Sequence, residues 1–207
     1  MNPPDAAATV RRNVAEARAL LAQLEPLTEP LERAAALLRD ALLGGNKLMC
    51  CGNGGSAADS AHFSAEITGR YHLDRPGYPA LDLTAEHSVV TALMNDYPPR
   101  EIFARQVRAF GQAGDVLAVF STSGNSENVR LALQAAHELD VHTIGFLGKT
   151  GGACRGMAEV ELIVPHDTTA RIQETHLLLY HTICEVLDPI LLQHAGSEPQ
   201  MNTDKHR

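Results

Sequence analysis

Short runs of apolar residues alternate along the chain with longer stretches in which apolar residues recur every three or four positions. The short runs have the length and composition of buried β-strands, whereas the longer stretches have the periodicity of amphipathic helices. We therefore predict strands at residues 47–52, 80–84, 115–121, 142–148 and 160–165, and helices at residues 6–24, 31–43, 56–71, 86–95, 99–111, 126–139 and 170–192.

This alternation indicates an α/β fold, a three-layer sandwich in which a central parallel sheet is flanked by helices. We expect a single domain, with a core at about residues 30–192 and an additional N-terminal helix within residues 1–29. Pro189 is expected to end or kink the last helix, and the polar segment 193–207 is expected to be disordered. Ligands of such sheets bind beyond the carboxyl ends of the strands, near a reversal in strand order.

Composition narrows the class of protein. The chain has 207 residues, of which 44% are hydrophobic and 20% charged, a balance typical of one soluble globular domain. Its formal net charge of −8 argues against a nucleic-acid partner, because binding to a phosphate backbone requires a basic surface. A small anionic ligand is still compatible with this charge, since it needs only a local cluster of donors.

The four cysteines form no CxxC pair, and Cys50 and Cys51 lie in an apolar run, so we interpret them as buried thiols. The first residues contain no apolar signal segment, and no run of about 18 apolar residues occurs. We therefore expect a cytoplasmic protein with no membrane partner.

Two polar loops follow predicted strands and precede predicted helices, "GNGGS" at 52–56 and "STSGNS" at 121–126. Glycines allow close approach of the backbone to a ligand, and Ser56 would stand at a helix start, where free N–H groups attract anions. The second loop adds the hydroxyls of Ser121, Thr122, Ser123 and Ser126. Hydroxyls and amides without Lys or Arg suit one phosphate monoester better than a triphosphate.

Other interpretations of these loops are open at this point. The Walker pattern GxxxxGK[ST] is absent, whereas "GNGGSA" matches the dinucleotide fingerprint GxGxxA, a weak signal when it stands alone. A plain turn with a capping serine would explain either loop by itself. Two such loops at one edge of a sheet favour a binding site.

Two predicted helices carry polar residues at spacings that bring side chains together. His62 and Glu66 are four residues apart and share a helix face, which suits metal binding, acid–base chemistry or a simple surface pair. Gln173 and His181 are about 80° apart on the helical wheel, whereas His176 is about 140° from His181 and fits less well. Convergence of the two helices would create a four-ligand site. The remaining histidines have no metal-ligand type of residue at ligand spacing along the sequence, and we interpret them as surface or core residues: His72, His87, His137, His142, His166, His194 and His206.

Several motifs together resemble phosphoheptose isomerases, a family of the sugar-isomerase (SIS) domain class, which implies a flavodoxin-like or Rossmann-like sheet. The resemblance runs from about residue 10 to 192, and its two loops are common to SIS proteins. The set of His62, Glu66, Gln173 and His181 is specific to the isomerases. The motifs are "CGNGGSAADSAHFSAEITGRY", "RPGYPA", "MND", "GDVLAVFSTSGNSENV", "RIQETH" and the helix of His181.

The resemblance implies a reaction, the conversion of sedoheptulose 7-phosphate to D-glycero-D-manno-heptose 7-phosphate on the route to ADP-heptose and lipopolysaccharide core. It also implies a homotetramer with active sites between subunits, and one zinc per subunit held by His62, Glu66, Gln173 and His181. Residues implied to contact substrate are Asn53, Gly54, Gly55, Ser56, Glu66, Asn95, Asp96, Ser121, Thr122, Ser123, Ser126 and Gln173.

The residue types suit ketose–aldose isomerisation, which moves a proton between C1 and C2 through an enediol and needs a base, an acid and charge stabilisation. Glu66 is the expected base and His181 the expected acid, and zinc would act as a Lewis acid. Asp59 either favours the helix dipole, caps the helix or binds a sugar hydroxyl.

Two other functions stay open. One is a non-catalytic tetrameric SIS paralogue that binds the replication initiator DnaA, although a binding module has no chemical need for the four candidate ligands. The other is a regulator that senses sugar phosphates, although the chain shows no recognisable DNA-binding extension.

Overall fold

One parallel sheet forms the centre of the molecule in the computed structural model, which describes residues 5–197. Its strand order is β2-β1-β3-β4-β5, and every neighbouring pair is parallel. The predicted α/β class is therefore confirmed. The strands are β1 (Leu48–Gly52), β2 (Ala80–Asp82), β3 (Val116–Ser121), β4 (His142–Gly148) and β5 (Val160–Val164).

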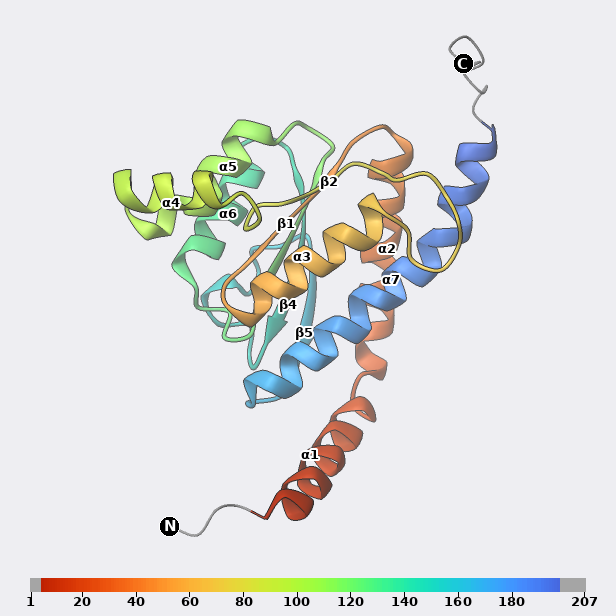
Figure 1. Cartoon of the computed structure of the whole chain (residues 1–207), viewed down its shortest axis with the longest axis vertical. Helices are drawn as coiled ribbons and strands as arrows, with labels where there is room; N and C mark the ends of the chain where they lie inside the picture. Colours follow the sequence, from red (N-terminus) through yellow and green to blue (C-terminus); the bar gives the residue numbers. More distant parts are fainter. Residues whose placement is uncertain (1–4, 198–207) are drawn as a thin grey trace.

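Helices cover both sides of this sheet (Figure 1). Alternate strand residues point to opposite sides, so Cys50 belongs to the apolar cluster beneath α2, α3 and α7, and Cys51 to the cluster beneath α5 and α6. α4 lies beyond α5 (Figure 1). The helices are α1 (Ala6–Leu21), α2 (Thr28–Leu43), α3 (Gly55–Thr68), α4 (His87–Asp96), α5 (Ile102–Phe110), α6 (Glu127–His137) and α7 (Thr169–Ser197), with 3₁₀ turns at Glu25–Leu27, Pro99–Glu101 and Gly152–Cys154.

The strand order reverses between β1 and β3, because the chain leaves β1 for β2 on one side and later returns to β3 on the other. Gly52 at the end of β1 pairs with Phe120 near the end of β3, so the loops 52–56 and 121–126 emerge side by side. Asn53 and Asn128 join the two segments through a pair of reciprocal side-chain amide hydrogen bonds of 2.9 Å. The predicted pair of loops thus lies at the switch point, where ligands of such sheets bind.

Of the two effects expected of Pro189, an end of the last helix is wrong, because α7 continues through it to Ser197, whereas a kink stays a prediction. Proline removes one backbone hydrogen bond, but Leu187 and Leu191 on either side of it are buried, and this burial holds the helix together. The expectation of disorder for 193–207 is therefore wrong for 193–197, and the rest of that segment lies outside the described residues.

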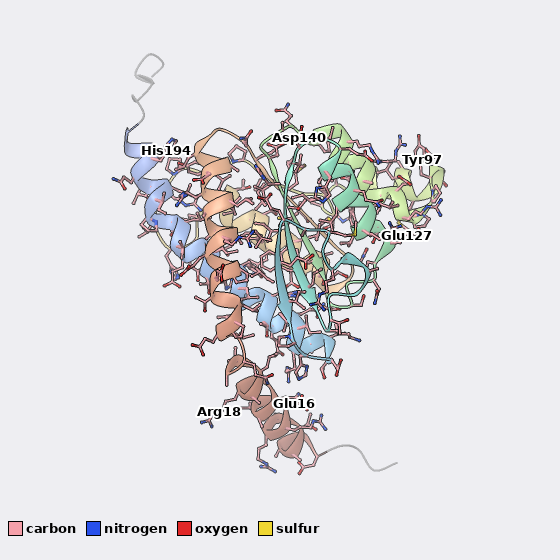
Figure 2. All side chains as sticks on the ribbon, turned by 180° about the vertical axis from the view of Figure 1, so that it is seen from behind. Glu16, Arg18, Tyr97, Glu127, Asp140 and His194 are labelled. Atoms are coloured by element: carbon pink, nitrogen blue, oxygen red, sulfur yellow. The ribbon has the colours of Figure 1, made fainter. Side chains whose placement is uncertain are left out.

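Helix α1 projects from the body of the molecule (Figure 1). Figure 2 shows Glu16 and Arg18 on this helix, clear of the sheet. α1 ends at Leu21, three residues before the predicted end, and exposes Val10 and Val14. No helix in the described part of the chain is long and apolar enough to cross a membrane.

Candidate active site

Three predicted site residues meet where α3 and α7 lie side by side (Figure 1). His62 Nε2 is 2.9 Å from Glu66 Oε1, one turn further along α3, and 3.4 Å from His181 Nε2 on α7. The three candidate ligand atoms lie within 4.8 Å of one another. The two helices therefore converge at this point, which spacing along the sequence could not establish.

Tyr180, which sequence reasoning missed, orients the ring of His62. Its hydroxyl lies 2.9 Å from His62 Nδ1, and burial raises the pKa of Tyr180, so the phenol stays protonated. This contact holds the ring whichever nitrogen carries the proton, so Nε2 can donate to Glu66 in the metal-free ring or, with the proton on Nδ1, bind a metal ion. No local signal marks Tyr180 for this role, because the two residues are 118 positions apart.

His181 is only partly buried and is surrounded by rings. Its ring centroid lies 4.9 Å from that of His62 and 5.4 Å from that of Tyr71. Desolvation, followed by the charge of His62, lowers the pKa of His181. The neutral imidazole is therefore favoured, a form that can bind a metal ion or exchange a proton with a sugar oxygen.

Asp59 lies one turn before His62 and does not cap the helix, since Gly54 is the N-cap residue of α3. The Asp59 carboxyl is buried, and its Oδ2 atom has no hydrogen-bond partner among the described residues. Burial raises the pKa of Asp59 to about 6, and the charge of nearby His62 opposes this rise. The site thus includes a second carboxyl group that is poorly solvated.

The two loops at the switch point are held by their own side chains. Gly54 has φ of +58°, a conformation that favours glycine, and so α3 begins directly after the turn. Ser121 is buried and accepts a hydrogen bond of 3.1 Å from the Gly124 N–H, while its Oγ lies 3.4 Å from Ser126 Oγ. Ser126 is the N-cap residue of α6, yet its hydroxyl makes no capping bond. The loops therefore bring hydroxyls and helix-start amides to one edge of the sheet, as an anion site requires.

Gln173 lies beside the first of these loops. A Cβ atom built on Gly55 would stand 2.3 Å from Gln173 Nε2, so a larger residue there would displace the Gln173 amide. The contact places the Gln173 amide at the start of α3, whereas His62 lies seven residues, roughly 10 Å, further along that helix. Its role as a fourth metal ligand stays a prediction.

Asn95 and Asp96 lie apart from the other candidates. Both are exposed at the end of α4, where Asn95 Nδ2 donates a 2.8 Å hydrogen bond to Asp96 Oδ1. α4 is on the α5 and α6 side of the sheet, opposite α3 and α7 (Figure 1). Within one chain these residues do not join His62 and His181, and their contact with substrate stays a prediction.

The donor set of His62, Glu66 and His181 suits zinc. Zinc accepts imidazole nitrogen and carboxylate oxygen, and two nitrogen ligands of a tetrahedral zinc lie roughly 3.3–3.4 Å apart. The two histidine Nε2 atoms are 3.4 Å apart. The three residues are thus compatible with a metal centre.

Comparison with known proteins identifies the class. The SIS domain family matches residues 13–148, so the chain is an SIS-domain protein. The phosphoheptose isomerase of Shewanella loihica is 49% identical over 170 residues, which are 81% of this chain and 86% of that relative. The structure of phosphoheptose isomerase GmhA from Neisseria gonorrhoeae has 44% identity and a TM-score of 0.84, and the match covers 89% of this chain and 100% of that one. The structure of a phosphoheptose isomerase from Francisella tularensis has 33% identity and a TM-score of 0.86. That match covers 90% of this chain and 100% of the other.

The chain therefore belongs to the phosphoheptose isomerase family. It is an enzyme, a sugar-phosphate isomerase, and the sheet with helices on both sides agrees with the fold of that family.

Proposed function

We propose that this protein converts sedoheptulose 7-phosphate to D-glycero-D-manno-heptose 7-phosphate, the first step towards ADP-heptose and lipopolysaccharide core. The observation that supports this most directly is the convergence of His62, Glu66 and His181 within 4.8 Å. Relatives named for the same substrate class support the choice of a heptose phosphate. A DnaA-binding paralogue has no use for such a cluster, and no observation favours it.

Glu66 is the proposed base, which takes a proton from one of the two reacting carbons and returns it to the other through an enediol. His181 is the proposed acid, because its lowered pKa supplies a neutral imidazole that can pass a proton between the sugar oxygens. Tyr180 keeps His62 in one orientation, with Nε2 of that ring 2.9 Å from Glu66 Oε1. The phosphate would bind the loop hydroxyls of Ser121, Thr122, Ser123 and Ser126 together with the glycine loop Asn53, Gly54, Gly55 and Ser56.

Zinc is the proposed cofactor, one ion per subunit, held by His62, Glu66 and His181, with Gln173 as the predicted fourth ligand. When bound, it would polarise the carbonyl and hydroxyl oxygens of the sugar as a Lewis acid. Glu66 would then exchange its ligand role for its role as base when substrate arrives.

A homotetramer with active sites between subunits is the proposed assembly. Helix α1 projects from the domain with Val10, Val14 and Leu21 at 60%, 61% and 50% exposure, an apolar stripe suited to a second copy. Helix α4, which ends with Asn95 and Asp96, lies on the opposite side of the sheet from α3, which carries His62 (Figure 1), so the two residues would contact substrate in the site of a neighbouring subunit.

The decisive experiment incubates the purified protein with sedoheptulose 7-phosphate and zinc, and follows the aldose product by NMR. We expect turnover, and loss of turnover with a chelator that is restored by added zinc. Ser121→Ala should raise KM more than it lowers kcat, because the phosphate is remote from C1 and C2. Failure to turn over any seven-carbon ketose phosphate, beside an active relative, would overturn the proposal.

A further inference from the structure

A buried arginine lies directly beneath the end of α3 that carries Glu66. Arg75 belongs to the segment between α3 and β2, and its side chain is 1% exposed. Glu66 is in the last turn of α3, where backbone carbonyls lack partners within the helix and the chain tends to fray. The position of a base in such a turn depends on whatever binds those carbonyls.

Arg75 binds them. Its Nη2 donates a 2.9 Å hydrogen bond to the backbone oxygen of Glu66 itself, and its Nη1 donates to that of Ile67 at 3.2 Å, both in the last turn of α3. Nη1 also donates to the Pro76 carbonyl at 3.1 Å, outside the helix. A guanidinium offers five N–H donors in a rigid plane, so one side chain can bind several carbonyls that diverge. The last turn of α3 is thereby fixed from below.

The same guanidinium reaches α7, the helix of His181. Arg75 Nε donates a 2.7 Å hydrogen bond to Asp188 Oδ1, and this carboxylate is 3% exposed. Asp188 Oδ2 accepts the backbone N–H groups of His72 at 2.8 Å and Leu73 at 2.6 Å. These bonds hold the chain next to Tyr71, whose ring centroid is 5.4 Å from that of His181.

Stability alone does not explain a buried ion pair here. Desolvation of two charges offsets much of their attraction, and apolar residues of similar size often give equal stability. The pair does join the three elements that surround the acid–base residues, namely the end of α3, the segment 71–73 and α7. We propose that Arg75 and Asp188 are positioning residues that fix Glu66 relative to His181. This inference rests on the proposed isomerase function.

Arg75→Lys is the main test, because lysine keeps the charge and the apolar stem but its single ammonium cannot bind Asp188 and the Glu66 carbonyl together. Displacement of a reacting group by about 1 Å can cost on the order of 10²-fold in rate. We expect kcat to fall roughly 10–10²-fold while KM changes less than about threefold, because the phosphate loops lie at the opposite end of α3. Asp188→Asn should give the same pattern if Arg75→Lys does not fold.

Asp115→Asn is the matched control. Asp115, whose side chain is 1% exposed, forms an ion pair of 2.6 Å with the partly buried Lys47 at the amino-terminal edge of the sheet. The Asp115→Asn variant should have a lowered melting temperature, as Arg75→Lys should, but an unchanged kcat. Equal kcat in folded Arg75→Lys and Asp115→Asn would overturn the inference.

A second measurement needs no substrate and no metal. The ring ¹⁵N signals of His62, assigned by their absence from His62→Gln, report its contacts with Glu66 on the same helix and with His181 on α7 in chelator-treated protein. They should shift in Arg75→Lys and stay in place in Asp115→Asn. If the wild type proved inactive while these signals shifted, the isomerase proposal would fail and the positioning role would stand. Unshifted signals in folded Arg75→Lys would count against the positioning role itself.

Discussion

The two sides of the sheet are built differently (Figure 1). Beneath α5 and α6 the buried residues are almost all apolar, and the buried amide of Gln106 is satisfied by the carbonyls of Leu83 and Ile102. Beneath α3 and α7 the core is aromatic but also contains Asp59, His176 and the Arg75–Asp188 pair. Burial of polar groups costs free energy unless they are paired. The side that bears this cost is the side that holds the site.

The largest expected effect is on the chemical step. Glu66→Gln keeps the shape of the side chain but cannot take a proton from carbon, and loss of a general base costs about 10²–10⁴-fold in rate. Solvent deuterium incorporation at C1 and C2 should fall by that factor, while substrate still binds, because the phosphate loops are intact. Glu138→Gln is the control, because Glu138 forms an exposed ion pair with Arg108 beside α6. With this variant, deuterium should enter C1 and C2 at the wild-type rate.

Metal content must be measured with Glu66→Gln, because the same carboxylate is a predicted ligand. Exchange lost with metal retained supports the role of base, and exchange lost with metal lost supports a ligand alone. Wild-type exchange in Glu66→Gln would contradict both roles.

On the α5 and α6 side the largest effect should be on stability. Leu133 in α6 is fully buried, and removal of such a side chain costs about 2–5 kcal/mol through lost burial and the resulting cavity. Chemical denaturation should show that Leu133→Ala loses this amount equally at pH 7 and pH 5, since no titrating group is changed. Activity per folded molecule should be unaffected. A pH-dependent loss, or a selective loss of kcat, would mean that the two sides are not independent.

The α3 and α7 side should instead be sensitive to acid through His176. This ring is fully buried against Phe120 and Phe146, its Nε2 lies 3.0 Å from the Leu147 carbonyl, and burial lowers the pKa of His176 to about 4. The unfolded chain takes up the proton near its ordinary pKa of about 6.5, so this contribution to stability is intact above that pH. It is lost as pH falls towards 4.

The loss should reach about 3 kcal/mol, from 1.36 kcal/mol per pKa unit. His176→Leu replaces the ring with an apolar side chain, and its unfolding free energy should fall less between pH 7 and pH 4.5 than that of the wild type. An identical fall in both proteins would show that His176 does not titrate in the folded state as its burial implies.

These contrasts also show which features could be predicted from sequence. Strand and helix positions follow from periodicity, a local property, and the glycine and serine loops follow from their place after strands. His62 and Glu66 share a helix face, so their contact was predictable. The contact of either with His181, the hydroxyl of Tyr180 on His62 and the bonds of Arg75 depend on how α3 packs against α7.

Local rules failed where tertiary packing prevailed. Pro189 was expected to end or kink α7, but the helix continues through it, because the residues on both sides of it are buried. The start of α3 shows the converse case. From the sequence, Gly55 is explained by its place in a glycine-rich loop at the start of a helix. In the structure the Gln173 amide, from α7, also occupies the space next to Gly55 where a Cβ atom would stand, and the sequence does not show this contact.

Asp59 gives the smallest and most diagnostic effect. Burial raises the pKa of this carboxyl to about 6, so the folded protein favours the protonated form more than the unfolded chain does, whose pKa is about 3.9. Below pH 3.9 the carboxyl is protonated in both states and does not lower the stability of the fold. As the pH rises from 3.9 through 6, it lowers the unfolding free energy by an increasing amount. Asp59→Asn removes the charge and keeps the size, so chelator-treated protein should gain unfolding free energy at pH 7, by at most about 3 kcal/mol, and close to none at pH 4. A stabilised but less active Asp59→Asn would show that the buried carboxylate is retained at the expense of stability for the site beside His62. If Asp59→Asn is instead less stable than the wild type at pH 7, the carboxylate is paired in the folded protein, and the two sides of the sheet differ less than their burial indicates.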